Sequence, residues 1–295
     1  MRMYQRGLCV AAFLLLAAGC GDQPAPSETT ERANSAPTAS TIDNPTQSDL
    51  QPPTDKSLTL DEYIEAGIPA HDRSWSGDDM TRAANILVAI AQKDASHLPR
   101  YHGEHSGKAF ERLTADENLD LYRNRSLPLE QRLPDALNYM QSANQILKLY
   151  LAAFNQNAVG DSELVELSGA QLRVTVVMIE LANEFLPTLD KDDPTYPVRM
   201  QGLQRMKNGM ASTVAGSLQT LTESHAYRTS ELKRFAGHLE ATLPDILPEL
   251  PDGSRAESLI RLRSFLDDPK MQHLKPELDI LVAAAEKSVV REKAP

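Results

Sequence analysis

Cysteine is scarce in this chain: Cys9 and Cys20 are the only two, and both lie close to the N-terminus. From residue 21 onward there is none, which excludes an internal disulfide in that part even in a compartment that permits disulfides. A folded domain there must be stabilised by packing alone. Residues 58–295 are numerous enough to bury a core of the necessary size.

Positive charge is also in short supply. The chain has 30 Lys and Arg residues against 41 Asp and Glu residues, which gives a formal net charge of −11 at pH 7. Binding to nucleic acid depends on a basic surface that neutralises phosphates, and docking on anionic lipid depends on basic residues as well. The composition argues against nucleic acid as a partner and against a domain that lies directly on a charged membrane.

The short motifs that mark common enzyme and cofactor sites are missing from the sequence. It contains no GxGxxG, GxxxxGK[ST], HExxH, GxSxG or CxxCH, and no Glu-x-x-His of a di-iron bundle. The acidic stretch DKDDPTYPVRMQ at 190–201 lacks the Gly and the final Glu of an EF-hand loop. The sequence therefore favours a protein that is not an enzyme and that uses no cofactor.

The N-terminal segment has the pattern of a secretory signal peptide. Arg2 and Arg6 provide a positively charged start, and Gly7 to Ala18 form an apolar run of twelve residues. Such a run is too short to span a bilayer, which needs about 20 apolar residues. Polar residues follow at once, so there is no stop-transfer pattern. We therefore expect export of the chain.

The end of this run, Ala18-Gly19-Cys20, resembles the lipobox of bacterial lipoproteins. Ala17 stands where such motifs usually have Leu. The resemblance implies removal of residues 1–19 and acylation of Cys20, with the membrane as a partner through that lipid. Because Gly21 rather than Asp follows the cysteine, the resemblance also favours the outer membrane facing the periplasm, if the cell has a second membrane. It covers only this segment, and the helical domain resembles no named family.

Residues 20–57 form a segment of different composition. It is rich in Pro, Ser and Thr and has no aromatic residue. Such a chain cannot bury enough apolar surface to offset the entropy lost on ordering, so a disordered linker is expected. As a flexible coil its ends would lie on the order of 35 Å apart. We expect residues 58–295 to form one all-helical domain, with two helical subdomains meeting near Gly160 as the alternative.

Apolar residues recur at helical spacing through most of this domain. Ser76 and Asp79 are placed as a capping box at one helix start. The run VTVVMI at 174–179 has strand propensity, but the helical pattern continues on both sides of it. The predicted fold class is all-α, a bundle or irregular array of about eight helices. The expected helices are 76–94, a short one from 114, one after Pro134 to 154, 161–189, 198–224, 229–243, 254–266 and 276–290.

Three glycines repeat every seven residues along the expected helix 198–224: Gly202, Gly209 and Gly216. Each glycine inside a helix costs about 1 kcal/mol relative to alanine, so three on one face need an explanation. We predict close packing of this face against the helix at 161–189. The alternative is a groove that holds an apolar ligand or a partner helix.

The segment HLPRYHGEH contains His97, His102, Glu104 and His105, with His71 upstream. Three imidazoles and a carboxylate can bind Zn²⁺ or Cu²⁺ if the fold brings them together. The segment is expected to be a loop, and solvent-facing histidines are the alternative to a metal site at His97, His102 and His105.

Glu180 and Glu184 lie four residues apart on the expected central helix. Paired carboxylates inside a bundle can perform acid–base chemistry. The ordinary alternative is ion pairing with Arg199, Arg205 and Lys207 on the helix that returns alongside.

These features favour a membrane-anchored, non-enzymatic interaction or scaffold module of the cell envelope, with an envelope protein as its partner. A tether raises the effective concentration of the domain near the membrane. The alternatives are a metal-binding protein or metal-dependent enzyme, which requires the histidines to converge, and a binder of a small apolar ligand, which requires a cavity. The interaction module requires an exposed groove or apolar patch.

Overall fold

The computed structural model describes residues 53–292, which contain helices and connecting segments but no strand. The predicted all-α fold class is confirmed. The predictions for the signal peptide, for Cys20 and for the linker up to residue 52 lie outside the described residues. The helices are α2 (Leu60–Glu65), α3 (Gly77–Lys93), α4 (Gly107–Thr114), α5 (Glu117–Arg123), α6 (Leu129–Asn155), α7 (Asp161–Phe185), α8 (Tyr196–Thr222), α9 (Thr229–Ile246), α10 (Asp252–Asp267) and α11 (Lys275–Glu292).

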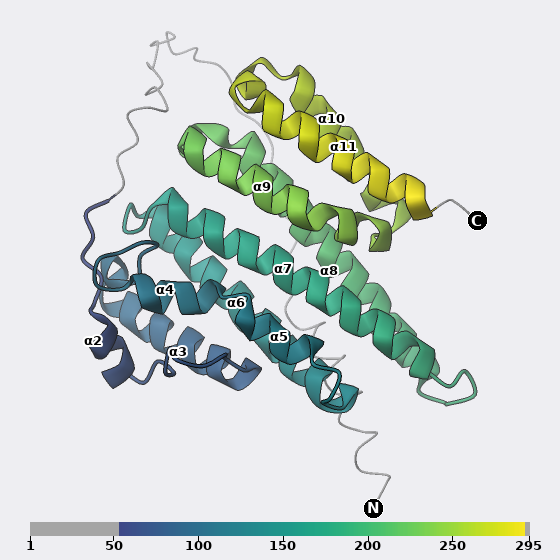
Figure 1. The fold of residues 1–295 in the computed structure, drawn as a ribbon, viewed down its shortest axis with the longest axis horizontal. Helices are drawn as coiled ribbons and strands as arrows, with labels where there is room; N and C mark the ends of the chain where they lie inside the picture. The colour runs from purple at the N-terminus through teal and green to yellow at the C-terminus, as the bar shows by residue number, and fades with distance from the viewer. Residues whose placement is uncertain (1–52, 293–295) are drawn as a thin grey trace, which may run out of the picture.

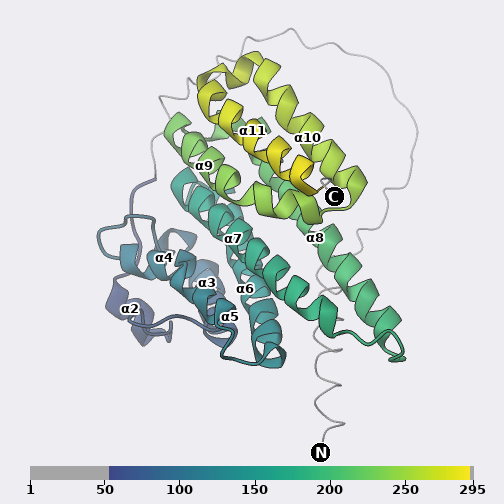
Figure 2. The ribbon, with the colours of Figure 1, turned by 45° about the vertical axis from the view of Figure 1, so that its right-hand side comes forward.

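The long helices form an array with α7 at its centre. Helix α3 packs on α6, α6 on α7, α7 on α9, and α9 on α11, and this row is visible across the molecule in Figure 1. Helix α8 contacts α7, α9 and α10. It lies behind α7 in Figure 1 and beside it in the turned view of Figure 2. The connection between α7 and α8 projects at one end of the array (Figures 1 and 2).

Local sequence signals account for several of the helix starts. At the start of α3, Ser76 accepts a hydrogen bond from the backbone N–H of Asp79, and the Asp79 carboxylate accepts one from the backbone N–H of Ser76. This confirms the predicted capping box, which satisfies two of the donors that a helix start leaves unpaired. Arg73 adds a bidentate contact to Asp79, at 2.6 and 2.8 Å.

Two features of the helix pattern differ from the prediction. Helix α6 starts at Leu129 rather than after Pro134, so Pro134 lies inside the helix, where it removes one backbone hydrogen bond. The short helices α2 and α4 were not expected. Helix α2 has a capping box of Thr59 and Glu62, a signal that the sequence offers.

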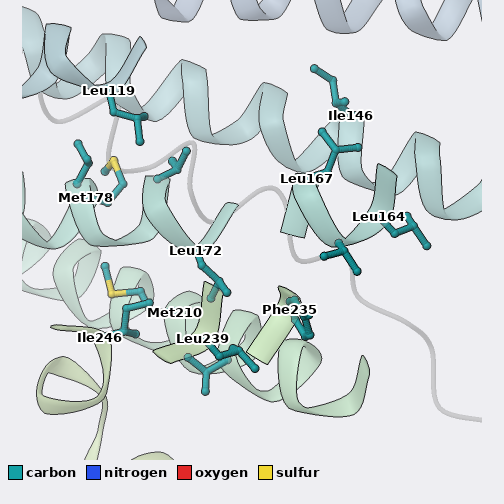
Figure 3. Packing of buried hydrophobic residues seen from close by; sticks show 14 of the residues in the cluster. Leu119, Ile146, Leu164, Leu167, Leu172, Met178, Met210, Phe235, Leu239 and Ile246 are labelled. Atoms are coloured by element: carbon teal, nitrogen blue, oxygen red, sulfur yellow. The ribbon is translucent and has the colours of Figure 1, made fainter. Parts of the chain in front are cut away.

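Helix α7 is buried on most of its surface, as expected for a helix with two apolar faces. On one side Leu172 points toward Leu239 of α9 and Met210 of α8, and on the other Met178 lies near Leu119 of α5 (Figure 3). The run at 174–179 is helical throughout. Among the described helices, none is long and apolar enough to cross a membrane.

Candidate functional site

A pocket of about 210 Å³ lies between the C-terminal half of α7, the N-terminal half of α8 and the short 3₁₀ helix η5 (Leu247–Glu249). One wall has residues spaced i, i+3, i+4 and i+7, which share one helical face: Ile179, Ala182 and Asn183 of α7, and Leu186 directly after it. The apolar stripe of α8 forms the opposite wall. The lining residues are Ile179, Ala182, Asn183, Leu186, Met200, Leu203, Gln204, Met206, Lys207, Met210 and Glu249.

The pocket walls are apolar and rich in methionine. Met200, Met206 and Met210 come from α8, and Ile179 faces them from α7. Methionine is unbranched and polarizable, so such walls adapt to different shapes. An engineered apolar cavity of about 150 Å³ holds benzene, whereas drug-sized ligands need about 300–1,000 Å³. This pocket is therefore the right size for one bulky side chain or a small fragment.

The rim of the pocket is polar, and side-chain contacts connect the elements that form it. The ammonium of Lys207 on α8 lies 3.2 Å from a carboxylate oxygen of Glu249 in η5, and the side-chain amide of Asn183 on α7 donates to the other oxygen at 3.3 Å. These contacts fix the three elements at the mouth. Leu186, which starts the 3₁₀ helix η3 (Leu186–Thr188), also lines the pocket, yet 45% of it is exposed to solvent.

The predicted close-packed glycine face is wrong for two of its three members. Gly202 is buried, but Gly209 and Gly216 are exposed, and an added Cβ would meet nothing within 4 Å at either. A helix turns roughly 100° per residue, so seven residues fall about 20° short of two full turns. The glycine series therefore drifts away from the buried stripe, and it does not line the pocket.

Replacing Gly209 or Gly216 by alanine is expected to raise the free energy of unfolding by about 0.5–1 kcal/mol each, because alanine is the better helix former and both sites have room. Urea denaturation of the two variants measures the change. Gly169 on α7 is the matched contrast: its added Cβ would lie 2.6 Å from the ring of His238, so Gly169→Ala should destabilise. A loss of stability at Gly209 or Gly216 would contradict the open environment described here.

The structure does not bring the predicted metal-binding histidines together. The His97 ring lies 3.7 Å from the carboxylate of Asp94. His102 has a left-handed backbone, with φ of 55°, and its ring lies against Tyr101. Exposed His105 follows at the turn that leads into α4. Within residues 53–292, no three His, Cys, Asp or Glu side chains are placed to share a metal ion, so the three histidines do not form the predicted site.

Glu180 and Glu184 form ion pairs, but not with the predicted partners on α8. Glu180 pairs with Arg123 of α5, at 2.9 Å, and Glu184 pairs with Arg132 of α6. The hydrogen bond from Arg132 lowers the pKa of Glu184, which is the opposite of what a general acid requires. The two carboxylates therefore join α7 to α5 and α6.

A buried ion pair at the other end of α7 was not anticipated. The Arg100 guanidinium lies 3.3 Å from Glu163, and both side chains are about 95% buried, with exposures of 5% and 4%. Arg100 also donates to the carbonyls of Ala158 and Pro53, and Glu163 accepts two backbone N–H groups. The pair fastens the loop before α4 and the first described residues to α7, which is a structural role.

A second set of charges joins α7 to α9. Arg228 donates to both carboxylate oxygens of Asp161. Arg234 lies 3.0 Å from Glu166 and also pairs with Glu231. Burial raises the pKa of Glu231. Asp161 and Glu166 of α7 each have a basic partner from α9 or the turn before it, which clamps the two helices together, whereas Glu231 pairs within the α9 segment.

The side chains that line the pocket are mostly apolar. Lys207 and Glu249 are its only ionisable lining residues, and they are paired with each other. Their pairing leaves no free nucleophile or base among the lining side chains, whereas the apolar walls remain accessible. Comparison with known proteins found no matching family model, no similar curated protein and no similar solved structure.

Proposed function

We propose that this chain is an exported lipoprotein, anchored through lipid on Cys20, whose helical domain is a non-enzymatic binding module of the cell envelope. The observation that carries the proposal is the methionine-lined pocket between α7 and α8, with an apolar residue exposed at its mouth. The signal-peptide pattern and the Ala18-Gly19-Cys20 motif support export and anchoring.

The position of the pocket suits a tethered module. Arg100 holds the carbonyl of Pro53 close to the start of α7, whereas the pocket lies at the end of α7. The 25 residues of α7 span about 37 Å. The pocket therefore lies far from the point where the segment from Cys20 joins the domain, and a partner in the aqueous compartment can reach it. In a cell with two membranes we place the protein on the outer one, facing the periplasm.

Site-specific photo-crosslinking in cells tests this function. With p-benzoylphenylalanine in place of Leu186, we expect a covalent adduct with one envelope partner. The same probe in place of Ile260, a 66% exposed residue on α10, is the matched control. A Cys20→Ala chain behind a conventional signal peptide should lose most of the adduct, because the tether supplies the effective concentration. Equal adducts at both probe positions, or none at Leu186, would contradict the proposed function.

A further inference from the structure

The size of the pocket and the exposure of its rim together restrict what can occupy it. A volume of about 210 Å³ accepts one bulky apolar side chain. A small molecule enclosed by the pocket would leave Leu186 in water, with 45% of its surface exposed. A partner that inserts one side chain and also covers the rim would bury Leu186 as well. The geometry therefore favours a macromolecular surface with an apolar anchor.

The walls of the pocket indicate which secondary structure of the partner presents the inserted side chain. Two helix faces, from α7 and α8, flank the opening, and grooves between helices accept the apolar face of an amphipathic helix. The three methionines allow the groove to fit more than one kind of bulky side chain. An inserted residue presented by a helix would have its neighbours at i±3 and i±4 lying along the rim.

The charges next to the pocket have an excess of carboxylates. The connection from α7 to α8 starts at the rim and leads back to the pocket-lining Met200. It carries the exposed carboxylates Asp190 and Asp192 with exposed Lys191 between them, and its third carboxylate, Asp193, pairs with Arg199. Glu249 lies on the rim, where it is shared by Lys207 and Asn183. The whole chain has a formal net charge of −11. Complementary charge steers association and selects partners, so a basic partner is favoured at this mouth.

We infer, resting on the proposed function, that the α7–α8 pocket binds a basic amphipathic helix of a partner protein. One Leu, Met or Phe of that helix enters between Ile179 and the α8 methionines, and its flanking apolar surface covers Leu186. Lys and Arg residues of the helix lie toward Asp190 and Asp192.

The inference is tested with the full chain, reconstituted in phosphatidylcholine nanodiscs, and defined peptides. The probe is a 14-residue peptide of Lys, Gln and Ala with Leu at the positions i, i+4, i+7 and i+11, labelled for fluorescence anisotropy. One control peptide has Glu at every Lys position, and another has Ala in place of the second Leu. Empty nanodiscs correct for binding to lipid. We expect the basic peptide to bind at least tenfold more tightly than either control peptide.

Variants of exposed residues assign the binding to the pocket without endangering the fold. The affinity for the basic peptide should fall at least tenfold in Leu186→Asp. It should fall by at least as much in the double variant Asp190→Lys with Asp192→Lys. Ile260→Asp and Glu257→Lys, which change exposed residues of α10 in the same way, should leave the affinity within about twofold.

Each other outcome overturns the inference. Equal affinity for the acidic and basic peptides would contradict the preference for a basic partner. Peptide binding that is unchanged by Leu186→Asp would show that the peptide does not bind at this pocket. Binding of the neutral probe N-phenyl-1-naphthylamine, blocked by Leu186→Asp while all peptides fail, assigns the pocket to a small apolar molecule. A protomer–protomer adduct in the crosslinking experiment assigns it to a second copy. If crosslinking from Leu186 captures one envelope protein but the basic peptide does not bind, the proposed function stands and this inference fails.

Discussion

Glu163→Ala should lower the free energy of unfolding by about 3–5 kcal/mol, the loss typical of breaking a buried ion pair by removing one partner. The reason is the state of Arg100, which is 5% exposed and would keep its charge without a carboxylate beside it. The variant also removes the acceptor for the backbone N–H groups of Tyr101 and Gly160. Chemical denaturation followed by circular dichroism measures the change.

Glu180→Ala is the matched control on the same helix. Glu180 also pairs with an arginine, Arg123, but the two side chains are 45% and 42% exposed. Exposed pairs contribute about 0–1 kcal/mol, so this variant should remain within about 1 kcal/mol of the parent. A double variant, Arg100→Met with Glu163→Leu, should recover much of the stability lost in Glu163→Ala, because no unpaired charge stays buried. Similar losses for Glu163→Ala and Glu180→Ala would contradict the role assigned to burial.

The features that could be predicted from the sequence are local ones. The capping box of Ser76 and Asp79 involves residues three positions apart, and the start of α3 follows from it. The central position of α7 follows from the two apolar faces that a period of 3.6 residues generates. These signals are complete within one or two helical turns, so they need no knowledge of which helices meet.

The features that were wrong or missed depend on which helices are neighbours. Glu184 was expected to find a partner on α8, but Arg132, 52 residues earlier in the chain, occupies that side of α7. Arg100 and Glu163 are likewise far apart in sequence, with no local pattern to connect them. The pocket needs α7, α8 and η5 at once. Periodicity shows which face of a helix is apolar, but it does not show which other helix covers that face.

The cooperativity of unfolding can be tested by truncating one core side chain. The truncated residue and the only tryptophan should lie on opposite sides of α7. Trp75 is fully buried beside the start of α3, and its indole N–H donates to the carbonyl of Ala70 at 2.8 Å. Phe235 is fully buried on α9, which packs on the opposite side of α7 from α6 (Figure 1). One continuous cluster of buried apolar residues contains both side chains.

Phe235→Ala is expected to lower the free energy of unfolding by about 3–5 kcal/mol, from lost burial and the cavity left behind. Because the apolar cluster is continuous through α7, unfolding of the C-terminal helices would expose α7 and remove support from α6 and α3. The urea unfolding transitions followed by Trp75 fluorescence and by helical circular dichroism should therefore have the same, lower midpoint, as a two-state transition requires. The exposed site variant Ile260→Ala should shift neither signal. If the Trp75 transition stays at the parent position while the circular dichroism curve splits in two, residues 58–295 are two subdomains that unfold separately, and the continuous cluster does not couple them.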